Sequence, residues 1–500
     1  MSKTMEIQTV QVSDMLQARD ERAENQRRML EKYHSPLISF TLNIAGPVKR
    51  DEWIERAFDE GVRRIEAQIG DLSINEVLEK RAFTGCERLW SVCGDAETLK
   101  RRMCFVEERD ALGRLMDMDV LNAQGEKLVR PDGERKCLLC GGAARVCARS
   151  RRHSAEELAR RTREIIVDHF QTKRASHIAE LAERALLCEL AVTPKPGLVD
   201  METNGAHEDM DRFTFVRSAC ALRPCFERCA RLGMENRSTE ETFFCLRREG
   251  LLAEETMLAA TGGVNTHKGA IFSLGLLCCA AGAADEPWAN ASPLMKTVSA
   301  LPESKMESAA ESKGSEISSA KGVFEQIPCT SIAEAEHTTP PFPESVESRR
   351  AALLRRAAAL AAYSMEDLSV LSPATAKTGG ERDYLRTGRT GARGEAAAGF
   401  PSVVQIALPT LEKALAEGKS ANLAGLEALT ALMRTVADAN VLRRAGEEGL
   451  KRVQRSARQS DASPESLRAL DREFTAERLS PGGCADLLAA AWLLHFLEED

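Results

Sequence analysis

Aromatic residues are scarce in this sequence: they make up 5% of the 500 residues, with only 4 tryptophans and 3 tyrosines. Single-stranded nucleic acids bind on stacked aromatic side chains, so this shortage argues against such a platform. An excess of positive charge is also missing, because the formal net charge is −8 and the pI is about 5.8. We therefore expect no general binding of nucleic acid.

Long hydrophobic runs and an apolar leader are missing as well. The longest apolar stretches, such as residues 271–284, fall short of the roughly 20 residues that a membrane helix needs. The first 26 residues are polar and contain no apolar core of a secretory signal. We expect a cytoplasmic protein that associates with no membrane.

Cysteine, by contrast, is plentiful, with 15 residues. In a reducing compartment we expect these side chains to be thiols or metal ligands rather than disulfides. The hydrophobic content of 43% and the charged content of 29% are ordinary for a globular protein. At roughly 150 residues per domain, the length predicts two to four domains.

Residues 283–346 differ from the rest of the chain. They hold 7 of the 18 prolines and carry 10 acidic against 4 basic residues, so most of the net negative charge lies here. Low apolar content without a sustained period cannot offset the entropy cost of ordering. We expect a disordered insert within a domain, and a short helical subdomain is the alternative.

The remaining sequence divides into a mixed part and a helical part. In the first part, helices are predicted over 13–33 and 51–68. Strands rich in β-branched or aromatic residues are predicted over 37–44, 89–93, 104–108 and 114–121. From residue 154 onwards a 3.6-residue apolar spacing predicts helices almost throughout, beginning with 154–170 and 176–192. A boundary near 170–175 gives an N-terminal α+β domain over 1–172 and a C-terminal all-α domain over 173–500.

Two aspartates, Asp117 and Asp119, alternate with apolar residues in the segment GRLMDMDV. On a strand, residues two apart project to the same face, so the two carboxylates point together. Such a pair suits a divalent ion, here Mg²⁺, that also holds a triphosphate during nucleotidyl transfer. The alternative is an exposed strand with two solvated acids.

Three cysteines and a histidine follow, namely Cys137, Cys140, Cys147 and His153, in the pattern C-x2-C-x6-C-x5-H. Four nitrogen and sulfur ligands at this spacing indicate a structural zinc site, although a second C-x-x-C is absent. The alternative is four free side chains, two of them buried thiols. A run of seven arginines between residues 145 and 163 suits phosphates or an acidic protein surface, or is simply a solvated helix face.

Three segments in this order, SFTLNIAGPVKR, GRLMDMDV and RKCLLCGGAARVCARSRRHSAEEL, resemble the apo-citrate lyase phosphoribosyl-dephospho-CoA transferase family. The resemblance covers about residues 10–170 and implies a nucleotidyltransferase-type domain. It implies transfer of a phosphoribosyl-dephospho-CoA group to a serine of an acyl-carrier subunit, with loss of pyrophosphate. Asp117 and Asp119 then become catalytic metal ligands, and triphosphate contacts are expected from Lys49, Arg50 and Arg114.

The helical part carries polar, glycine-rich loops between its apolar helices. Helix connections need only two to eight residues, so the surplus of Lys, His, Asp and Asn indicates a polyphosphate or nucleotide pocket. Backbone N–H groups at a helix start add a site for phosphate. The loops read TPKPGLVD, NGAHEDMD, GGVNTHKGA, GARGEAAAGFP, DANVLR and SPGGCADLL.

These loops, in this order, resemble the triphosphoribosyl-dephospho-CoA synthase family over about residues 176–500, interrupted by the 283–346 insert. The resemblance implies that ATP and 3′-dephospho-CoA give 2′-(5″-triphosphoribosyl)-3′-dephospho-CoA and adenine. Such chemistry needs a carboxylate base, a donor to adenine, and Mg²⁺ with cations on the triphosphate.

Roles in this reaction are hypotheses that rest on the resemblance. Asp200 or Asp209 is the expected base, and His207 or His267 is expected near adenine or phosphate. Asp438 and Asp486 are expected Mg²⁺ ligands. Substrate contacts are expected from Lys195, Asn265, His267, Lys268, Arg393 and Arg443.

Together the two resemblances describe consecutive steps in the maturation of citrate lyase, with its acyl-carrier (gamma) subunit as the protein partner. Two alternatives stay open from the sequence. The same chemistry matures malonate decarboxylase, which would change only the carrier. The other is a carrier-binding adaptor with one inactive half, against which the retained Asp117, Asp119 and C-terminal loops argue.

Overall fold

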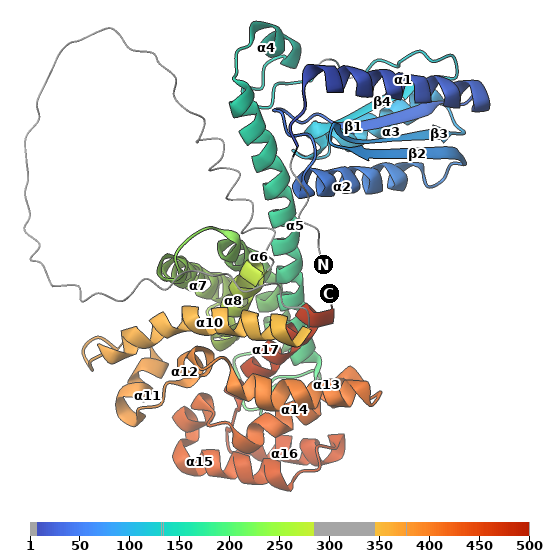
Figure 1. Ribbon diagram of the computed structural model, residues 1–500. Coiled ribbons are helices and arrows are strands. Elements are labelled where there is room, and N and C mark those ends of the chain that lie inside the picture. Colours follow the sequence, from blue (N-terminus) through green and yellow to red (C-terminus); the bar gives the residue numbers. More distant parts are fainter. Residues whose placement is uncertain (1–7, 132, 134, 285–345, 377, 500) are drawn as a thin grey trace, which may run out of the picture.

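The computed structural model of the protein describes residues 8–131, 133, 135–284, 346–376 and 378–499. The predicted insert over 283–346 therefore lies almost wholly outside the described residues. A small sheet with its helices forms the N-terminal part, and the C-terminal part is mostly helical, as the sequence predicts (Figure 1).

The sheet has four antiparallel strands in the order β2-β3-β1-β4. Its central strand β1 (Leu37–Leu42) is the sequence LISFTL, whose β-branched and aromatic side chains suit a buried pleated surface. The other strands are β2 (Ile74–Ala82), β3 (Gly85–Val92) and β4 (Met116–Leu121).

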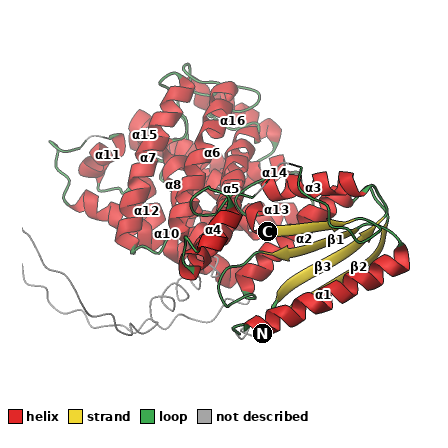
Figure 2. Cartoon of the chain, turned by 90° about the horizontal axis from the view of Figure 1, so that it is seen from above, coloured by secondary structure: helices red, strands yellow, loops and turns green. Residues whose placement is uncertain are grey.

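Three helices cover the two faces of this sheet. Helix α1 (Val12–Tyr33) runs along one face (Figure 2), while α2 (Glu52–Ile69) and α3 (Ala96–Glu108) pack on the other. The Phe40 and Phe58 rings stack with centroids 5.0 Å apart between β1 and α2. This packing buries one side of β4 and leaves its other side available for polar residues.

Two expectations about this part are wrong. Residues 104–108 belong to α3 and not to a strand, because Asp95 caps a helix that presents Leu99 and Met103 to the core. Strand β2 escapes detection because its sequence INEVLEKRA is dominated by charged residues on an exposed edge.

Helix α5 (Ala155–Ala191) is 37 residues long and joins the two parts. It begins with a capping box formed by Ser154 and Glu157. The expectation of two helices broken near 170–175 is wrong, because no Pro or Gly interrupts this stretch. The first half of α5 contacts the sheet part through the Arg163–Asp51 ion pair at 2.8 Å. The division at residue 172 stays a prediction.

The helical part packs around two apolar helices, α8 (Lys268–Ala284) and α17 (Gly482–Glu499). No helix in the described ranges is long and apolar enough to cross a membrane. Around this pair lie α6 (Arg212–Met234), α7 (Thr239–Thr261), α10 (Val346–Ser369), α11 (Gly379–Thr387), α12 (Gly391–Ala397), the π-helix η2 (Val403–Ala407), α13 (Leu408–Ala416), α14 (Ala421–Thr435), α15 (Ala439–Gln459) and α16 (Pro464–Ala476).

Candidate functional site

A cavity of about 1670 Å³ opens in the helical part, at the ends of its helices. The glycine-rich loops that are far apart in the sequence meet around it. The structure therefore brings together ten of the expected residues of this part, which are Lys195, His207, Asp209, Asn265, His267, Lys268, Arg393, Asp438, Arg443 and Asp486.

Asp200 is not among the residues that line this cavity. Its carboxylate is buried and accepts backbone N–H bonds from Lys195 at 2.7 Å, Glu202 at 2.7 Å and Thr203 at 2.8 Å. A carboxylate held by three backbone donors shapes its own loop. Asp200 thus positions the segment that carries Lys195.

Two aspartates meet where α17 and α15 begin. Asp438 is 2% exposed and accepts N–H bonds from Asn440 at 2.8 Å, Val441 at 3.1 Å and Cys484 at 2.9 Å. Burial raises the pKa of Asp438, although these three bonds lower it. Burial raises the pKa of Asp486 well above its usual value, and the charges of Glu189 and Asp438 raise it further. Carboxylates crowded in this way favour either a proton or a cation between them.

Sequence reasoning missed Glu189, the partner of Lys195 in a buried ion pair. The Lys195 ammonium donates to the Glu189 carboxylate and, at 2.8 Å, to its carbonyl oxygen. Burial raises the pKa of Glu189, and the lysine opposes this shift. The sequence does mark Glu189, because it is the one acidic residue in the otherwise apolar helical segment LLCELA.

His267 is 3% exposed, and its Nε2 atom is buried without a hydrogen-bond partner among the described residues. Its Nδ1 lies 2.7 Å from the Ser218 hydroxyl, which accepts a bond from Thr266 at 2.8 Å. The Phe215 ring meets it edge-on at 4.9 Å. Burial, and then the nearby Lys195 charge, lowers the pKa of His267 to about 3. The ring is therefore neutral near pH 7.

His207 is also held as a neutral ring. Arg444 can only donate, so at 3.4 Å the His207 Nδ1 accepts, and Nε2–H donates to Ser480 Oγ at 2.9 Å. Burial lowers the pKa of His207, and the Arg444 charge lowers it further. The Asp209 carboxylate lies 3.9 Å from Nδ1 and is largely exposed.

Cationic side chains also line the cavity. Arg393 donates to Glu381 at 3.1 Å, while its Nη1 is buried without a partner among the residues that the structure describes. Arg443 donates to Asn440 at 2.7 Å, and Lys268 pairs with Glu254 at 2.6 Å. Sequence reasoning missed four further cations of the lining, Arg247, Arg386, Arg389 and Arg444.

A tight approach joins the start of α8 to Asp486. A Cβ atom at Gly269 would collide with Asp486 Oδ2, so any side chain here would displace that carboxylate. Asn265 Oδ1 accepts the Lys268 N–H at 3.3 Å and closes the first turn of α8. The loop GGVNTHKGA thereby sets both the position of the Asp486 carboxylate and the start of the helix.

In the N-terminal part, Asp117 and Asp119 project from the same face of β4, opposite Thr41 and Ser39 of β1. Both are partly exposed. Asp119 pairs with Lys127 at 2.5 Å, and Asp117 lies 3.4 Å from Arg135. The shared face is thus as expected, and cations already lie against both carboxylates.

The three expected triphosphate contacts lie on the segments that follow β1 and precede β4, at one end of the sheet. The Asn43 N–H donates to the Leu115 carbonyl at 2.7 Å, which joins the segment after β1 to the turn before β4. Lys49 donates to the Ile44 carbonyl at 2.5 Å, and burial lowers its pKa. Arg50 pairs with Glu55 at 2.6 Å, and Arg114 donates to the Lys136 carbonyl.

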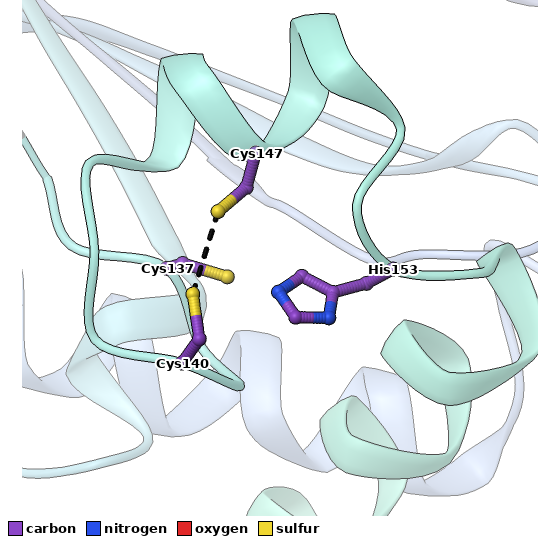
Figure 3. Close-up of side chains that lie close together, drawn as sticks. All are labelled: Cys137, Cys140, Cys147 and His153. Carbon is purple, nitrogen blue, oxygen red and sulfur yellow. Dashed lines mark hydrogen bonds between the residues drawn. The ribbon is translucent and has the colours of Figure 1, made fainter.

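The three cysteines and the histidine form a single cluster (Figure 3). Ligand atoms of Cys137, Cys140, Cys147 and His153 all lie within 4.8 Å of one another. The Cys140 and Cys147 sulfurs are 3.4 Å apart. Among the described residues this is the one group whose donor set suits a soft metal.

Family comparisons match the two parts in order. Residues 10–169 match CitX, the apo-citrate lyase phosphoribosyl-dephospho-CoA transferase family. Residues 175–500 match CitG, the ATP:dephospho-CoA triphosphoribosyl transferase family. The class of protein is therefore a transferase with two different parts, and both resemblances seen in the sequence are confirmed.

Relatives with both parts extend over nearly the whole chain. "Protein CitXG" of Haemophilus influenzae is 32% identical over 96% of this chain and 95% of its own length. "Protein CitXG" of Leuconostoc mesenteroides subsp. cremoris is 28% identical over 95% of this chain and 94% of its own. The 2-(5''-triphosphoribosyl)-3'-dephosphocoenzyme-A synthase of Pectobacterium atrosepticum is 36% identical over 67% of this chain and 93% of its own.

The chain belongs to the CitXG family, and it is a bifunctional transferase of citrate lyase maturation. The alternative of malonate decarboxylase maturation is not favoured by these matches.

Proposed function

We propose that the cavity of the helical part makes 2′-(5″-triphosphoribosyl)-3′-dephospho-CoA from ATP and 3′-dephospho-CoA. The observation that carries this proposal is the cavity itself, whose volume of about 1670 Å³ exceeds the roughly 300–1,000 Å³ that holds one ligand. It has room for two nucleotides, and its lining combines crowded acids with many cations. In the reaction the 2′-hydroxyl oxygen bonds to ribose C1′, the C1′–N9 bond breaks, and adenine leaves with that electron pair.

Oxygen donors of Asp438 and Asp486 fit Mg²⁺, which prefers carboxylates together with substrate phosphates. When bound, the ion supplies charge that neutralises the triphosphate. The crowding of the two carboxylates supports a cation at this position. Lys195, Lys268, Arg393 and Arg443 then bind the remaining phosphate oxygens, with Asn265 closing the α8 turn beneath them.

Proton transfers are assigned to groups that line the cavity. Asp209 is the base that takes the proton of the attacking hydroxyl, because Asp209 lines the cavity and Asp200 does not. Neutral His207 accepts a hydrogen bond from Arg444 and donates one to Ser480, and so holds Arg444, whose charge orients Asp209. His267 donates from Nε2 to adenine or phosphate, since the Ser218 hydroxyl at Nδ1 favours a ring hydrogen on Nε2.

The N-terminal part then transfers phosphoribosyl-dephospho-CoA to a serine of the apo acyl-carrier (gamma) subunit and releases pyrophosphate. We assign this step to a nucleotidyltransferase-type site with Asp117 and Asp119 as Mg²⁺ ligands. Oxygen donors on one strand face fit that ion. Lys49, Arg50 and Arg114 are the proposed triphosphate contacts, and the arginines of α4 (Ala144–Ser150) and early α5 are the proposed dock for an acidic carrier.

One assay tests both steps. The full chain is incubated with ATP, Mg²⁺ and 3′-dephospho-CoA, and adenine is measured by chromatography. Apo acyl-carrier subunit is then added and its mass is followed. Absence of adenine would contradict the first step, whereas adenine without a mass gain of the carrier would contradict only the second.

A further inference from the structure

We propose that Cys137, Cys140, Cys147 and His153 bind one zinc ion in a closed, structural site. This site contains none of the acids assigned to the two reactions proposed above, and it goes beyond those reactions. Three thiolates and one imidazole are a ligand set that zinc takes in structural sites. Four protein ligands complete a tetrahedral shell, so no position is left for a substrate or a reactive water.

The distances fit a tetrahedral ion. Zinc–sulfur bonds of about 2.3 Å place two sulfurs about 3.8 Å apart in a tetrahedron. The 3.4 Å between the Cys140 and Cys147 sulfurs is close to that value, and all four ligand atoms lie within 4.8 Å of one another. Small shifts of flexible side chains bring them onto one ion.

A second observation comes from the histidine. The Nε2 atom of His153 is buried and has no hydrogen-bond partner among the described residues. Figure 3 shows the imidazole of His153 facing the three cysteines. A metal ion bound at Nε2 satisfies a polar atom that otherwise stays unpaired inside the protein.

The backbone of the first two ligands is shaped for this purpose. Gly141 adopts a left-handed φ of 69°, and its N–H donates to the Cys137 carbonyl at 3.2 Å. The Cys137 N–H donates back to the Gly142 carbonyl at 2.6 Å. This tight turn, continued by the bridge between Lys136 and Ala143, sets the two thiols side by side.

The other two ligands come from the elements that follow. Cys147 lies on the short helix α4, and His153 directly precedes Ser154, the N-cap of α5. Val146 of α4 is 63% exposed, so this short helix buries little apolar surface of its own. A bound metal ion would hold the Cys137–Gly142 turn, α4 and the start of α5 together.

The same turn reaches the aspartates of β4. The Arg135 carbonyl accepts the Ala144 N–H at 2.9 Å. The guanidinium of the same arginine lies 3.4 Å from Asp117. Loss of zinc should therefore disturb carrier modification by the N-terminal part and spare adenine release in the distant cavity.

Metal analysis of the purified full chain tests the proposal. We expect one zinc per chain, loss of bound zinc in Cys147→Ser and His153→Ala, and retention in Cys93→Ser, which changes an exposed thiol outside the cluster. Cobalt-substituted protein should show the visible absorption of a tetrahedral thiolate site.

Adenine release provides the folding control, since both cluster variants should keep the wild-type rate. A zinc content below 0.1 per chain after growth with added zinc would overturn the proposal. So would a Cys140–Cys147 disulfide found by mass spectrometry in protein purified under reducing conditions, or zinc that persists in both variants.

Discussion

Burial and neighbouring charges shift the pKa of individual side chains in the cavity from their ordinary values. Asp486 is crowded by Glu189 and Asp438, and His267 is buried beside Lys195. These environments favour the uncharged form of each group in the empty protein. A cation bound beside Asp486 would favour the charged form of that carboxyl, so cation binding and proton release there should be linked.

Replacing Asp486 with Asn should lower the rate of adenine release by about 100-fold or more, the range for loss of a group that acts on transition-state charge. Asn keeps the shape but removes the negative charge. Because burial raises the folded-state pKa of Asp486, the ligand-free wild type should lose stability as the pH rises through the range between its ordinary and raised values. The variant should lose less, as measured by thermal unfolding without Mg²⁺.

The matched control for Asp486→Asn is Glu448→Gln, which changes an 84% exposed carboxylate of α15. It should keep both the rate and the pH dependence of the wild type. An Asp486→Asn variant with full activity would remove this residue from the proposed site.

Replacing His267 with Gln should lower adenine release by about 10- to 100-fold, the effect of losing one buried hydrogen bond. Its folded-state pKa of about 3 lies below the usual 6.5, so the wild type loses stability as the pH falls below about 6.5. Between pH 6.5 and 5 this loss amounts to about 2 kcal/mol. Urea unfolding of the variant should show a smaller loss.

His34→Asn serves as the control for His267, because His34 is exposed and its left-handed φ of 52° suits asparagine. Equal acid sensitivity of wild type and His267→Gln would argue that the ring is not held neutral by burial.

At the scale of elements, the cavity depends on where helices start. Helix α8 begins at Lys268, and the next residue, Gly269, lies against Asp486 of α17. The two helices can come this close only because a side chain is missing there. The start of α8 thus determines where the Asp486 carboxylate lies and where the first backbone N–H groups of the helix, which suit an anion, are placed.

Gly269→Ala should lower adenine release at least about 10-fold, because the added methyl group displaces the Asp486 carboxylate from its position. Gly275→Ala is the matched control in the same helix, since its Cβ would meet Cys229 Sγ at an ordinary 3.6 Å. The steady-state rate and the circular dichroism of both variants decide the outcome. Equal rates would contradict the role of the close approach.

Local patterns in the sequence predicted some elements and missed others for physical reasons. Strand β1 and helix α2 were found because their apolar spacing is strong, and the loops of the cavity were found because glycine and charged residues mark them. Strand β2 was missed because its charges hide the alternation. The Glu189–Lys195 pair could not be predicted, because it depends on how α5 and the next loop fold together.

At the scale of the whole molecule, the two sets of acids lie in separate parts of the chain. Asp117 and Asp119 belong to the sheet, while Asp438 and Asp486 belong to the helical part. The order of the parts agrees with the family matches. Each activity should therefore be removable without the other.

The double variant Asp117→Asn and Asp119→Asn should release adenine at the wild-type rate and fail to increase the mass of the apo acyl-carrier subunit. The physical reason is that the Mg²⁺ site proposed for the sheet part uses these two carboxylates, whereas the site proposed for the helical part uses other acids. Mass spectrometry of the carrier after addition of separately made product measures the second step alone. Loss of adenine release in this variant would contradict the independence of the two sites.

The continuous helix α5 has a consequence for the intermediate. At about 1.5 Å per residue its 37 residues span about 55 Å, and the sheet and the helical part lie toward opposite ends of it (Figure 1). A single continuous helix of this length separates the sheet from the helical part while keeping both in one molecule. We therefore expect the product of the first step to diffuse through water to the second site. If ATP carries an isotope label, unlabelled product added from outside should dilute the label that reaches the carrier.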